Sequence, residues 1–183
     1  GVVKNQRGDF AGALEFLDRA LERNPRSALA HLHRGNALWG LGRTQEALSH
    51  FQHCLRLNPE QPDALLNSAA ALSRLDRHAE ALQRLDRLLA LQPGSAAALM
   101  NRGAVLEKLG RLQEALASHD RALALSPDWP DALCNRGNTL LLLERYAEAL
   151  ASYERTLALD PGHPEALENR DNPLLHSGIA VQD

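Results

Sequence analysis

A repeat of fixed length constrains the fold of this chain more than any other feature of its sequence. Five prolines stand 34 residues apart, at Pro25, Pro59, Pro93, Pro127 and Pro161. The same step recurs for an alanine, at Ala13, Ala47, Ala81, Ala115 and Ala149, and for a leucine, at Leu38, Leu72, Leu106 and Leu140. A period of this length is typical of arrays in which each copy packs only against its neighbours. We therefore expect a stack of similar units rather than one central core.

The amino-acid composition indicates the fold class and disfavours some kinds of partner. The apolar residues recur at the spacing of a helix, and aromatic residues make up only 4% of the chain, which predicts an all-α protein. The formal net charge of −3 gives no electrostatic reason to bind nucleic acid or an anionic membrane, so we expect neither as a partner. The apolar run Leu140–Leu143 is far shorter than a membrane span, and the N-terminus lacks the pattern of a signal peptide. These features favour a soluble, cytoplasmic protein.

Each repeat is predicted to form two helices, and the repeated proline prevents the second helix from continuing. The predicted pairs are Ala28–Leu41 with Thr44–Leu57, Pro62–Leu75 with His78–Leu91, Ala96–Leu109 with Leu112–Leu125, and Pro130–Leu143 with Tyr146–Leu159. Another helix is expected over Phe10–Arg23, after Gly8 has ended the preceding one in the left-handed conformation. Ser27 and Ser95 are candidate N-caps, while Pro62, Pro130 and Pro164 occupy first helical turns, where proline loses no hydrogen bond.

The repeats also define the predicted domain organisation. The array covers residues 1–170, with a partial repeat at 1–27, complete repeats at 28–61, 62–95, 96–129 and 130–163, and a partial repeat from 164. The chain thus begins part-way into a repeat, and Pro173 breaks the last copy to leave an irregular tail over 171–183. Because the array lacks a polar capping helix, we expect its ends either to mediate self-association or to be covered by the tail.

A helix pair of 34 residues with glycine, alanine and proline at these offsets resembles the tetratricopeptide repeat. We count positions within each repeat so that the proline is position 32. The small residue at position 8, alanine at 20 and aromatic residue at 24 are matched by Gly35, Ala47 and Phe51, and again by Gly137, Ala149 and Tyr153. The resemblance covers nearly the whole chain. It implies an α-solenoid of antiparallel helix pairs, wound into a right-handed superhelix, whose first helices line a concave groove for peptides.

The chain departs from this family pattern at several places. Arginine replaces leucine at position 7 in Arg34 and Arg136, Ala69 replaces glycine, Leu88 is large where a small residue is expected, and His119 stands at an aromatic position. These departures affect the expected local packing and leave the expected fold unchanged.

One face of each first helix supplies the candidate groove residues. They are His33, Asn36, Trp39, Asn67, Arg74, Asn101, Lys108, Asn135, Asn138 and Asn169. Position 6 holds four asparagines, although asparagine is a mediocre helix former. This file of amides resembles the asparagine ladder of O-linked N-acetylglucosamine transferase-like arms, where amides bind an extended peptide backbone. The alternative is that each amide bonds a neighbouring helix, as buried amides commonly do.

The other residues of this face indicate what the groove would hold. Trp39 is a candidate hot-spot anchor, or else an aromatic residue folded against the incomplete first repeat. Position 5 is apolar in the four complete copies, with Leu32, Leu66, Met100 and Cys134, so we expect an apolar lining. Family members that clamp a chaperone's C-terminal carboxylate use lysine at position 5. That mode is disfavoured here, because Arg74 and Lys108 are the only cations expected in the groove.

No catalytic or metal-binding pattern emerges from the sequence. Cys54 and Cys134 lie in predicted helices at least two pairs apart, so we expect free, buried thiols and no disulfide. His31 and His33 face different sides of their helix, whereas zinc requires three or four converging ligands, so we expect no metal. Phosphate-binding glycine loops and nucleophile motifs are not found, so we expect no cofactor and no enzymatic activity.

The leading interpretation is a non-enzymatic scaffold that binds a peptide or a partner protein in the groove. A second interpretation is the substrate-recognition arm of a larger enzyme, similar to a repeat-bearing glycosyltransferase. A third is an oligomerisation module that uses the exposed ends of the array.

Overall fold

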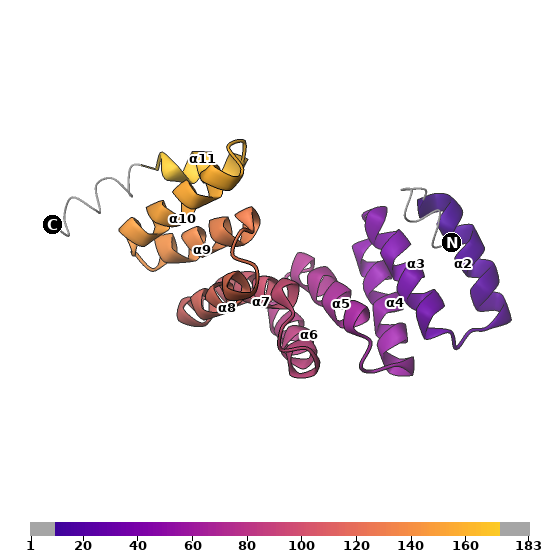
Figure 1. Ribbon diagram of the computed structural model, residues 1–183. Helices are drawn as coiled ribbons and strands as arrows, with labels where there is room; N and C mark the ends of the chain where they lie inside the picture. The colour runs from indigo at the N-terminus through magenta and orange to yellow at the C-terminus, as the bar shows by residue number, and fades with distance from the viewer. Residues whose placement is uncertain (1–9, 173–183) are drawn as a thin grey trace. The chain divides into compact units, whose positions relative to one another are not determined.

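A computed structural model of the chain describes residues 10–172, which form ten α-helices, labelled α2 to α11, and no strand (Figure 1). By their internal contacts the residues separate into two compact units, Gly1–Pro93 and Gly94–Asp183. The border falls in the turn between α6 and α7. The predicted all-α class is therefore confirmed.

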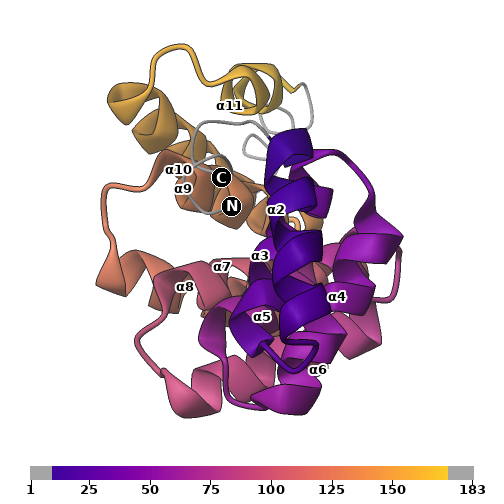
Figure 2. The same ribbon diagram turned by 90° about the vertical axis from the view of Figure 1, so that its right-hand side faces the viewer.

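The first unit contains five helices that pack in the order of the sequence. They are α2 (Phe10–Arg23), α3 (Ala28–Gly40), α4 (Thr44–Leu57), α5 (Pro62–Arg74) and α6 (His78–Leu91). Each helix packs against the next, and α3 also contacts α5. Consecutive helices run antiparallel (Figure 1 and Figure 2). The first helices α3 and α5 thus touch each other as well as their own partners.

The second unit repeats this arrangement. It contains α7 (Ala96–Lys108), α8 (Leu112–Leu125), α9 (Pro130–Leu142), α10 (Tyr146–Leu159) and the short α11 (Pro164–Arg170). Sequential helices pack against one another, and the first helices touch in the pairs α7–α9 and α9–α11.

The helix bounds agree closely with those expected from the sequence. The second helix of every predicted pair matches residue for residue, and α11 ends at Arg170, where the sixth copy was expected to fail. Each first helix ends one residue early because a leucine acts as its C-cap, as Leu41 does by donating its N–H to the carbonyl oxygens of Ala37 and Leu38. The predicted helix before Gly8, the break at Pro173 and the tail lie outside the described residues.

The predicted helix starts are confirmed as well. The Ser27 and Ser95 side chains accept hydrogen bonds from the N–H groups of Ala30 and Ala98, at 3.2 and 3.3 Å. Pro62, Pro130 and Pro164 open α5, α9 and α11. The sequence did not reveal a histidine cap: His163 Nδ1 accepts from the N–H of Ala166 at 3.2 Å. These caps supply acceptors for N–H groups that have no partner within the helix.

Contacts between a glycine and a large side chain hold the two helices of a pair close together. Gly35, Gly103 and Gly137 at position 8 face Phe51, His119 and Tyr153 at position 24. A Cβ on Gly137 would lie 2.6 Å from Tyr153 Cε1, inside van der Waals contact. The exception, Ala69, is matched by the smaller Leu85 at position 24, and both are buried. The family's small and large positions are therefore complementary in shape.

The arginines at position 7 occupy their unusual place because they form polar bridges. Arg136 contacts the Asp120 carboxylate of the preceding repeat at 2.6 Å and donates to Ser152 of its own repeat at 2.8 Å. Arg34 likewise pairs with Asp18 at 2.7 Å and with His50. The arginine thus links two successive second helices, where the family pattern would place an apolar contact.

The turn within each repeat requires a left-handed backbone at position 15. Gly42 and Gly110 supply it with φ of 73° and 71°, but Asp76 and Glu144 adopt φ of 58° and 60° at the same place. Only glycine takes this conformation without a steric cost, and a residue such as glutamate loses more than aspartate.

We expect Glu144→Gly to raise the free energy of unfolding by about 1 kcal/mol, because it removes this backbone strain at an exposed site. Urea denaturation would measure the change. Gly110→Ala is the matched control and should lower stability by about the same amount. A loss of stability in Glu144→Gly would contradict the argument.

Candidate functional site

Three of the predicted groove residues in the first unit surround one pocket. Asn36 and Trp39 from α3 and Asn67 and Ala70 from α5 line a cavity of about 230 Å³, which we call the Trp39 pocket. It exists because α3 and α5 pack side by side, so that residues at positions 6 and 9 of successive first helices meet. The pocket combines an aromatic ring, a methyl group and two amides, which is the kind of lining that ligand sites use.

A hydrogen bond between two amides sets the geometry of this pocket. Asn67 Nδ2 donates to Asn36 Oδ1 at 2.8 Å, and both side chains are half-buried. Both amides keep groups that have no hydrogen-bond partner among residues 10–172. Asn36 keeps its N–H donors and one lone pair of its oxygen, and Asn67 keeps its oxygen and one N–H donor. These groups stay able to bond a ligand. The pair therefore holds its amides in fixed positions and keeps part of their hydrogen-bonding capacity.

Arg74 adds a positive charge at the same place. Its guanidinium carbon lies 5.4 Å from the centre of the Trp39 ring, within the range of a cation–π contact, and the side chain is exposed. Trp39 is half-buried, lines the pocket and contacts this cation. The structure thus brings together Asn36, Trp39, Asn67 and Arg74, four of the residues selected from the sequence.

His33 and the position 5 residues contribute differently. His33 is half-buried on α3, and burial lowers its pKa, so the imidazole is neutral at pH 7. Leu32 and Cys134 are only 2% and 1% exposed. The expectation that position 5 lines the groove is therefore wrong for these two, whereas Leu66 and Met100 are half-buried. The next first helix covers this side of the face, which a single helix's periodicity does not reveal.

In the second unit Asn138 and Asn169 are engaged with neighbouring helices. Asn169 Nδ2 donates to Asn138 Oδ1 at 2.8 Å, repeating the pair seen between Asn67 and Asn36. Asn138 also accepts from the Tyr153 hydroxyl at 2.9 Å and donates to the Glu165 carboxylate at 2.8 Å. Asn138 therefore joins α9 to α10 and α11, with little capacity left for a ligand.

The remaining ladder residues lack this amide partner. Position 9 is alanine in the fourth repeat, Ala104, and Asn135 of the next repeat instead places its Nδ2 3.3 Å from Met100 Sδ. Asn101 is half-buried on α7, and Lys108 is exposed at the end of that helix. Within each unit, a position 6 asparagine thus pairs with position 9 of the preceding repeat when that residue is also asparagine. The alternative expectation, that each amide bonds a neighbouring helix, therefore describes Asn67 and Asn169.

A cluster of three histidines in the first unit was missed at the sequence level. His31, His50 and His53 lie with ring centres 4.9 to 6.1 Å apart. His31 Nε2 lies 3.1 Å from the Pro25 carbonyl oxygen, which only accepts, so this nitrogen carries the proton. His31 Nδ1 then accepts from His50 Nδ1 at 3.0 Å, and His50 Nε2 accepts from Arg34. Both rings are therefore neutral, and burial lowers the pKa of His50 to about 4.

Burial raises the pKa of the Cys134 thiol to about 12 and that of Cys54 as well, so both thiols are protonated; both are free, as predicted. Between Phe10 and Asn172 no group of histidine, cysteine, aspartate or glutamate side chains is arranged to hold a metal ion. None of the helices in that range has the length and apolarity that a membrane span requires.

Repeated antiparallel helix pairs with a polar face on their first helices define a helical-repeat protein of the α-solenoid class. Three models of one family, the tetratricopeptide repeat, match residues 6–62, 38–104 and 94–162. The chain belongs to the tetratricopeptide repeat family. A search of curated proteins returned no match.

Solved structures share the fold along almost the whole chain. YrrB, described as a tetratricopeptide repeat protein with an unusual peptide-binding site, is 27% identical over 93% of this chain and 88% of its own, with a TM-score of 0.81. TTC0263 from Thermus thermophilus is 25% identical over 98% of this chain and 95% of its own, with a TM-score of 0.73. MamA from Desulfovibrio magneticus is 21% identical over 88% and 91%, with a TM-score of 0.82, and shows a likeness of fold alone.

Proposed function

We propose that this protein is a non-enzymatic interaction scaffold that binds a peptide segment of a partner protein along its first helices. The observation that carries the proposal is the Trp39 pocket, where Asn36, Trp39 and Asn67 line one cavity and Arg74 stands over the indole ring. The likeness to YrrB supports it, because YrrB has a peptide-binding site.

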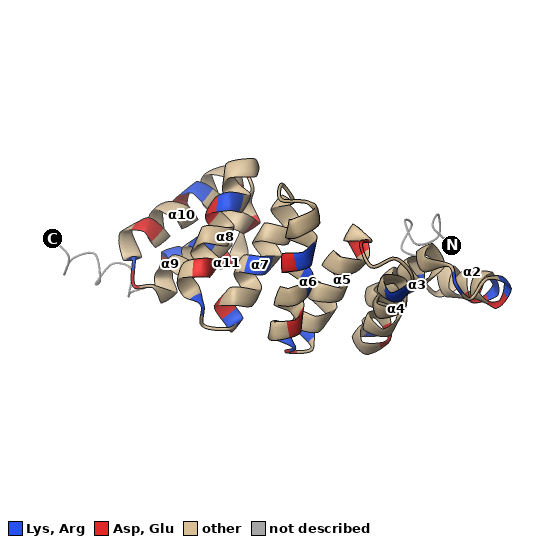
Figure 3. Cartoon of the chain, turned by 90° about the horizontal axis from the view of Figure 1, so that it is seen from below, with Lys and Arg blue, Asp and Glu red and all other residues tan. Residues whose placement is uncertain are grey.

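The chemistry of the pocket suits a peptide. An indole face binds an apolar or aromatic side chain, and Trp is a frequent hot spot of protein interfaces. The spare donors and acceptor of Asn36 and Asn67 match the alternating N–H and C=O groups of an extended backbone. Arg74 would attract a carboxylate next to the anchoring side chain. Acidic and basic residues are interspersed on α6, α8 and α10 (Figure 3), which favours a protein over nucleic acid as the partner.

Only some residues of the asparagine ladder are proposed to bind the peptide. We assign backbone recognition to Asn67 with Asn36, and to Asn101 and Asn135, which have no amide partner of their own. Asn138 and Asn169 hold helices together, while His33 and Lys108 border the proposed groove. Cytoplasmic location and self-association through the ends of the array remain part of this proposal and rest on the sequence.

The Trp39 pocket gives the direct test of the proposed function. A peptide selected from a random library against the intact chain should bind at least tenfold more weakly to Trp39→Ala, because the loss of a hot-spot side chain costs about 2 kcal/mol or more. Asn67→Ala should weaken it by a smaller factor. In a Trp129→Phe background Trp39 is the only tryptophan, so its fluorescence reports binding directly.

Trp129→Ala is the matched control, since the chain's other tryptophan precedes α9 and does not line the Trp39 pocket. It should leave the affinity unchanged. Circular dichroism and melting temperature would verify that every variant is folded. Equal affinities of the original chain and Trp39→Ala for the selected peptide would refute the proposal.

A further inference from the structure

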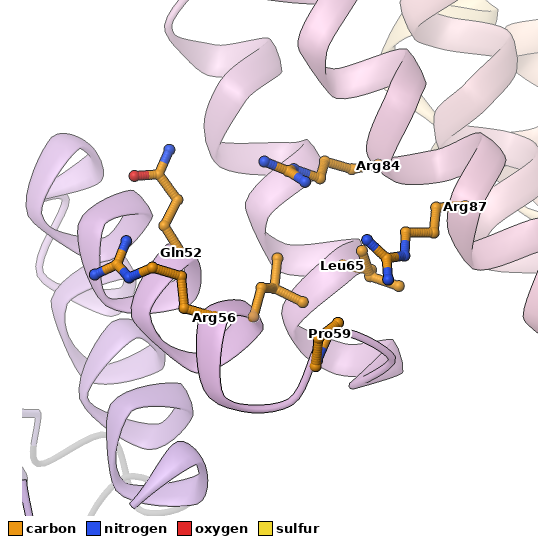
Figure 4. Close-up of a pocket in the computed structure, with 7 residues that line it drawn as sticks. Gln52, Arg56, Pro59, Leu65, Arg84 and Arg87 are labelled. Carbon is orange, nitrogen blue, oxygen red and sulfur yellow. The ribbon is translucent and has the colours of Figure 1, made fainter. Parts of the chain in front are cut away.

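A second pocket in the first unit is built on different helices. It has a volume of about 230 Å³ and is lined by Gln52, Leu55 and Arg56 from α4, Leu65 from α5 and Arg84 and Arg87 from α6, beside Pro59. Leu55 and Leu65 are buried and form an apolar floor. Figure 4 shows Arg84 and Arg87 extending from α6 toward α4, which carries Arg56. We call this cavity the arginine pocket.

Two positive charges, those of Arg84 and Arg87, extend into the arginine pocket, whereas the Arg56 side chain lines it but extends away from them (Figure 4). Arg56, Arg84 and Arg87 form no ion pair with any residue between 10 and 172, and the lining contains no aspartate or glutamate. On the same helix, Glu80 is held by Arg77 through two hydrogen bonds of 2.7 and 2.8 Å, and Asp86 does not line the pocket. Two cations beside one apolar-floored cavity repel each other, and an anion would relieve that repulsion.

The second unit contains the equivalent groove, and there the charges are balanced. Its lining includes Asp120, Arg136, Ser152 and Arg155 at the same repeat positions. Asp120 lies 2.6 Å from Arg136, and Asp128 lies 3.4 Å from Arg155. The carboxylates of this groove therefore come from the protein itself.

Position by position, the arginine pocket lacks what the equivalent groove has. Gln52 stands where that groove has Asp120, and Ser68 stands where it has Arg136, so the ion pair across the groove is missing. Arg84 replaces Ser152, while Arg87 corresponds to Arg155. The arginine pocket thus lacks the carboxylate of the equivalent groove. It retains one arginine as Arg87 and has an additional one in Arg84.

We propose that the arginine pocket binds an oxyanion, a carboxylate or a phosphate group, which takes the place of the missing carboxylate at position 25. Guanidinium groups bind both kinds of oxyanion through paired N–H donors, and Gln52 supplies a further donor. The volume exceeds that of several water molecules, at roughly 30 Å³ each, so the oxyanion can be carried on a short apolar stem that lies on Leu55 and Leu65. Its polar side chains come from α4 and α6, whereas those of the proposed peptide site come from α3 and α5.

The test restores the carboxylate that the equivalent groove contains. Inorganic phosphate and glutarate, each titrated against the intact chain at constant ionic strength, should raise its melting temperature, and calorimetry should give a dissociation constant. Gln52→Asp should raise the melting temperature in the absence of either anion. It should also weaken binding of both at least tenfold, since the new carboxylate occupies the guanidinium groups.

Two further variants locate the effect. Arg84→Ser introduces the residue of the equivalent groove and should also weaken binding at least tenfold, whereas Arg155→Ser in the second unit should leave binding unchanged. Binding of only one anion would identify the favoured class of oxyanion and would still support the site. An equal response to sodium chloride, or unchanged binding in Gln52→Asp, would overturn the proposal.

Discussion

Gly35→Ala is expected to destabilise the protein by about 3 kcal/mol, although alanine is the better helix former. The new Cβ would overlap the ring of Phe51, and that ring is fully buried, so a shift of the ring must displace other core side chains. The cost of overpacking therefore exceeds the gain in helix propensity, which is at most about 1 kcal/mol. Urea denaturation at neutral pH would measure the loss, and an unchanged slope would show that the same cooperative unit unfolds.

The third repeat supplies the compensating partner for this substitution. There Ala69 occupies the glycine position and the smaller Leu85 faces it. Phe51→Leu alone should destabilise the chain by leaving a cavity, but the double variant should recover about 2 kcal/mol of the summed losses. If the two losses simply add, the close approach of Gly35 to Phe51 is not what fixes the helix pair.

The fold could be predicted almost completely because its signals are local and repeated. Ser27 caps a helix with its own hydroxyl, Pro62 opens one, and the proline at position 32 prevents continuation. Each signal acts within a few residues, and each occurs again 34 residues later. Only the ends of the first helices differed, by one residue, because the C-cap leucine is still hydrogen-bonded to the helix.

The candidate site could be predicted only in part, because it depends on contacts between repeats. The 100° step per residue places Asn36, Trp39 and Asn67 on one face of their helices. It does not reveal that Asn67 reaches Asn36, nor that the next first helix buries Leu32, because both depend on how α3 packs against α5. Pairing across repeats is a tertiary property that periodicity leaves undetermined.

The arginine pocket was missed for a related reason. Arginines on second helices read as solvated surface charge, which is the usual role of such residues. The available signal was a broken pattern: Asp18 and Asp120 hold position 25, whereas the second repeat has Gln52. Its meaning depended on knowing that Asp18 and Asp120 pair with arginines of the following repeat, which only the structure provides.

Because His119 is buried, we expect the protein to lose stability in mild acid. His119 is fully buried against Gly103 with no hydrogen-bond partner for either ring nitrogen, and burial lowers its pKa to about 4, although Asp120 opposes and Arg136 adds to the shift. In the unfolded chain the pKa is 6.5. Between these two values the unfolded state binds more protons, so the stability is complete above pH 6.5 and decreases as the pH falls toward 4. We expect His119 to contribute a decrease of about 2–3 kcal/mol from pH 7.5 to 4.5.

His119→Phe isolates this contribution, because carboxylates and the remaining histidines titrate in both proteins. Phenylalanine is chosen because the second repeat has Phe51 at the same position. Tyrosine would leave its hydroxyl without a partner, because Tyr153 donates to Asn138 and the fourth repeat has Ala104 in place of that asparagine. Urea denaturation of both proteins at pH 7.5 and 4.5 should show the smaller decrease in His119→Phe, by about 2–3 kcal/mol. Burial also lowers the pKa of His50, so His119→Phe should retain part of the acid sensitivity, and His50→Ser should remove some of it. Identical decreases in the original chain and in His119→Phe would mean that the buried ring is protonated without unfolding the helix pair around it.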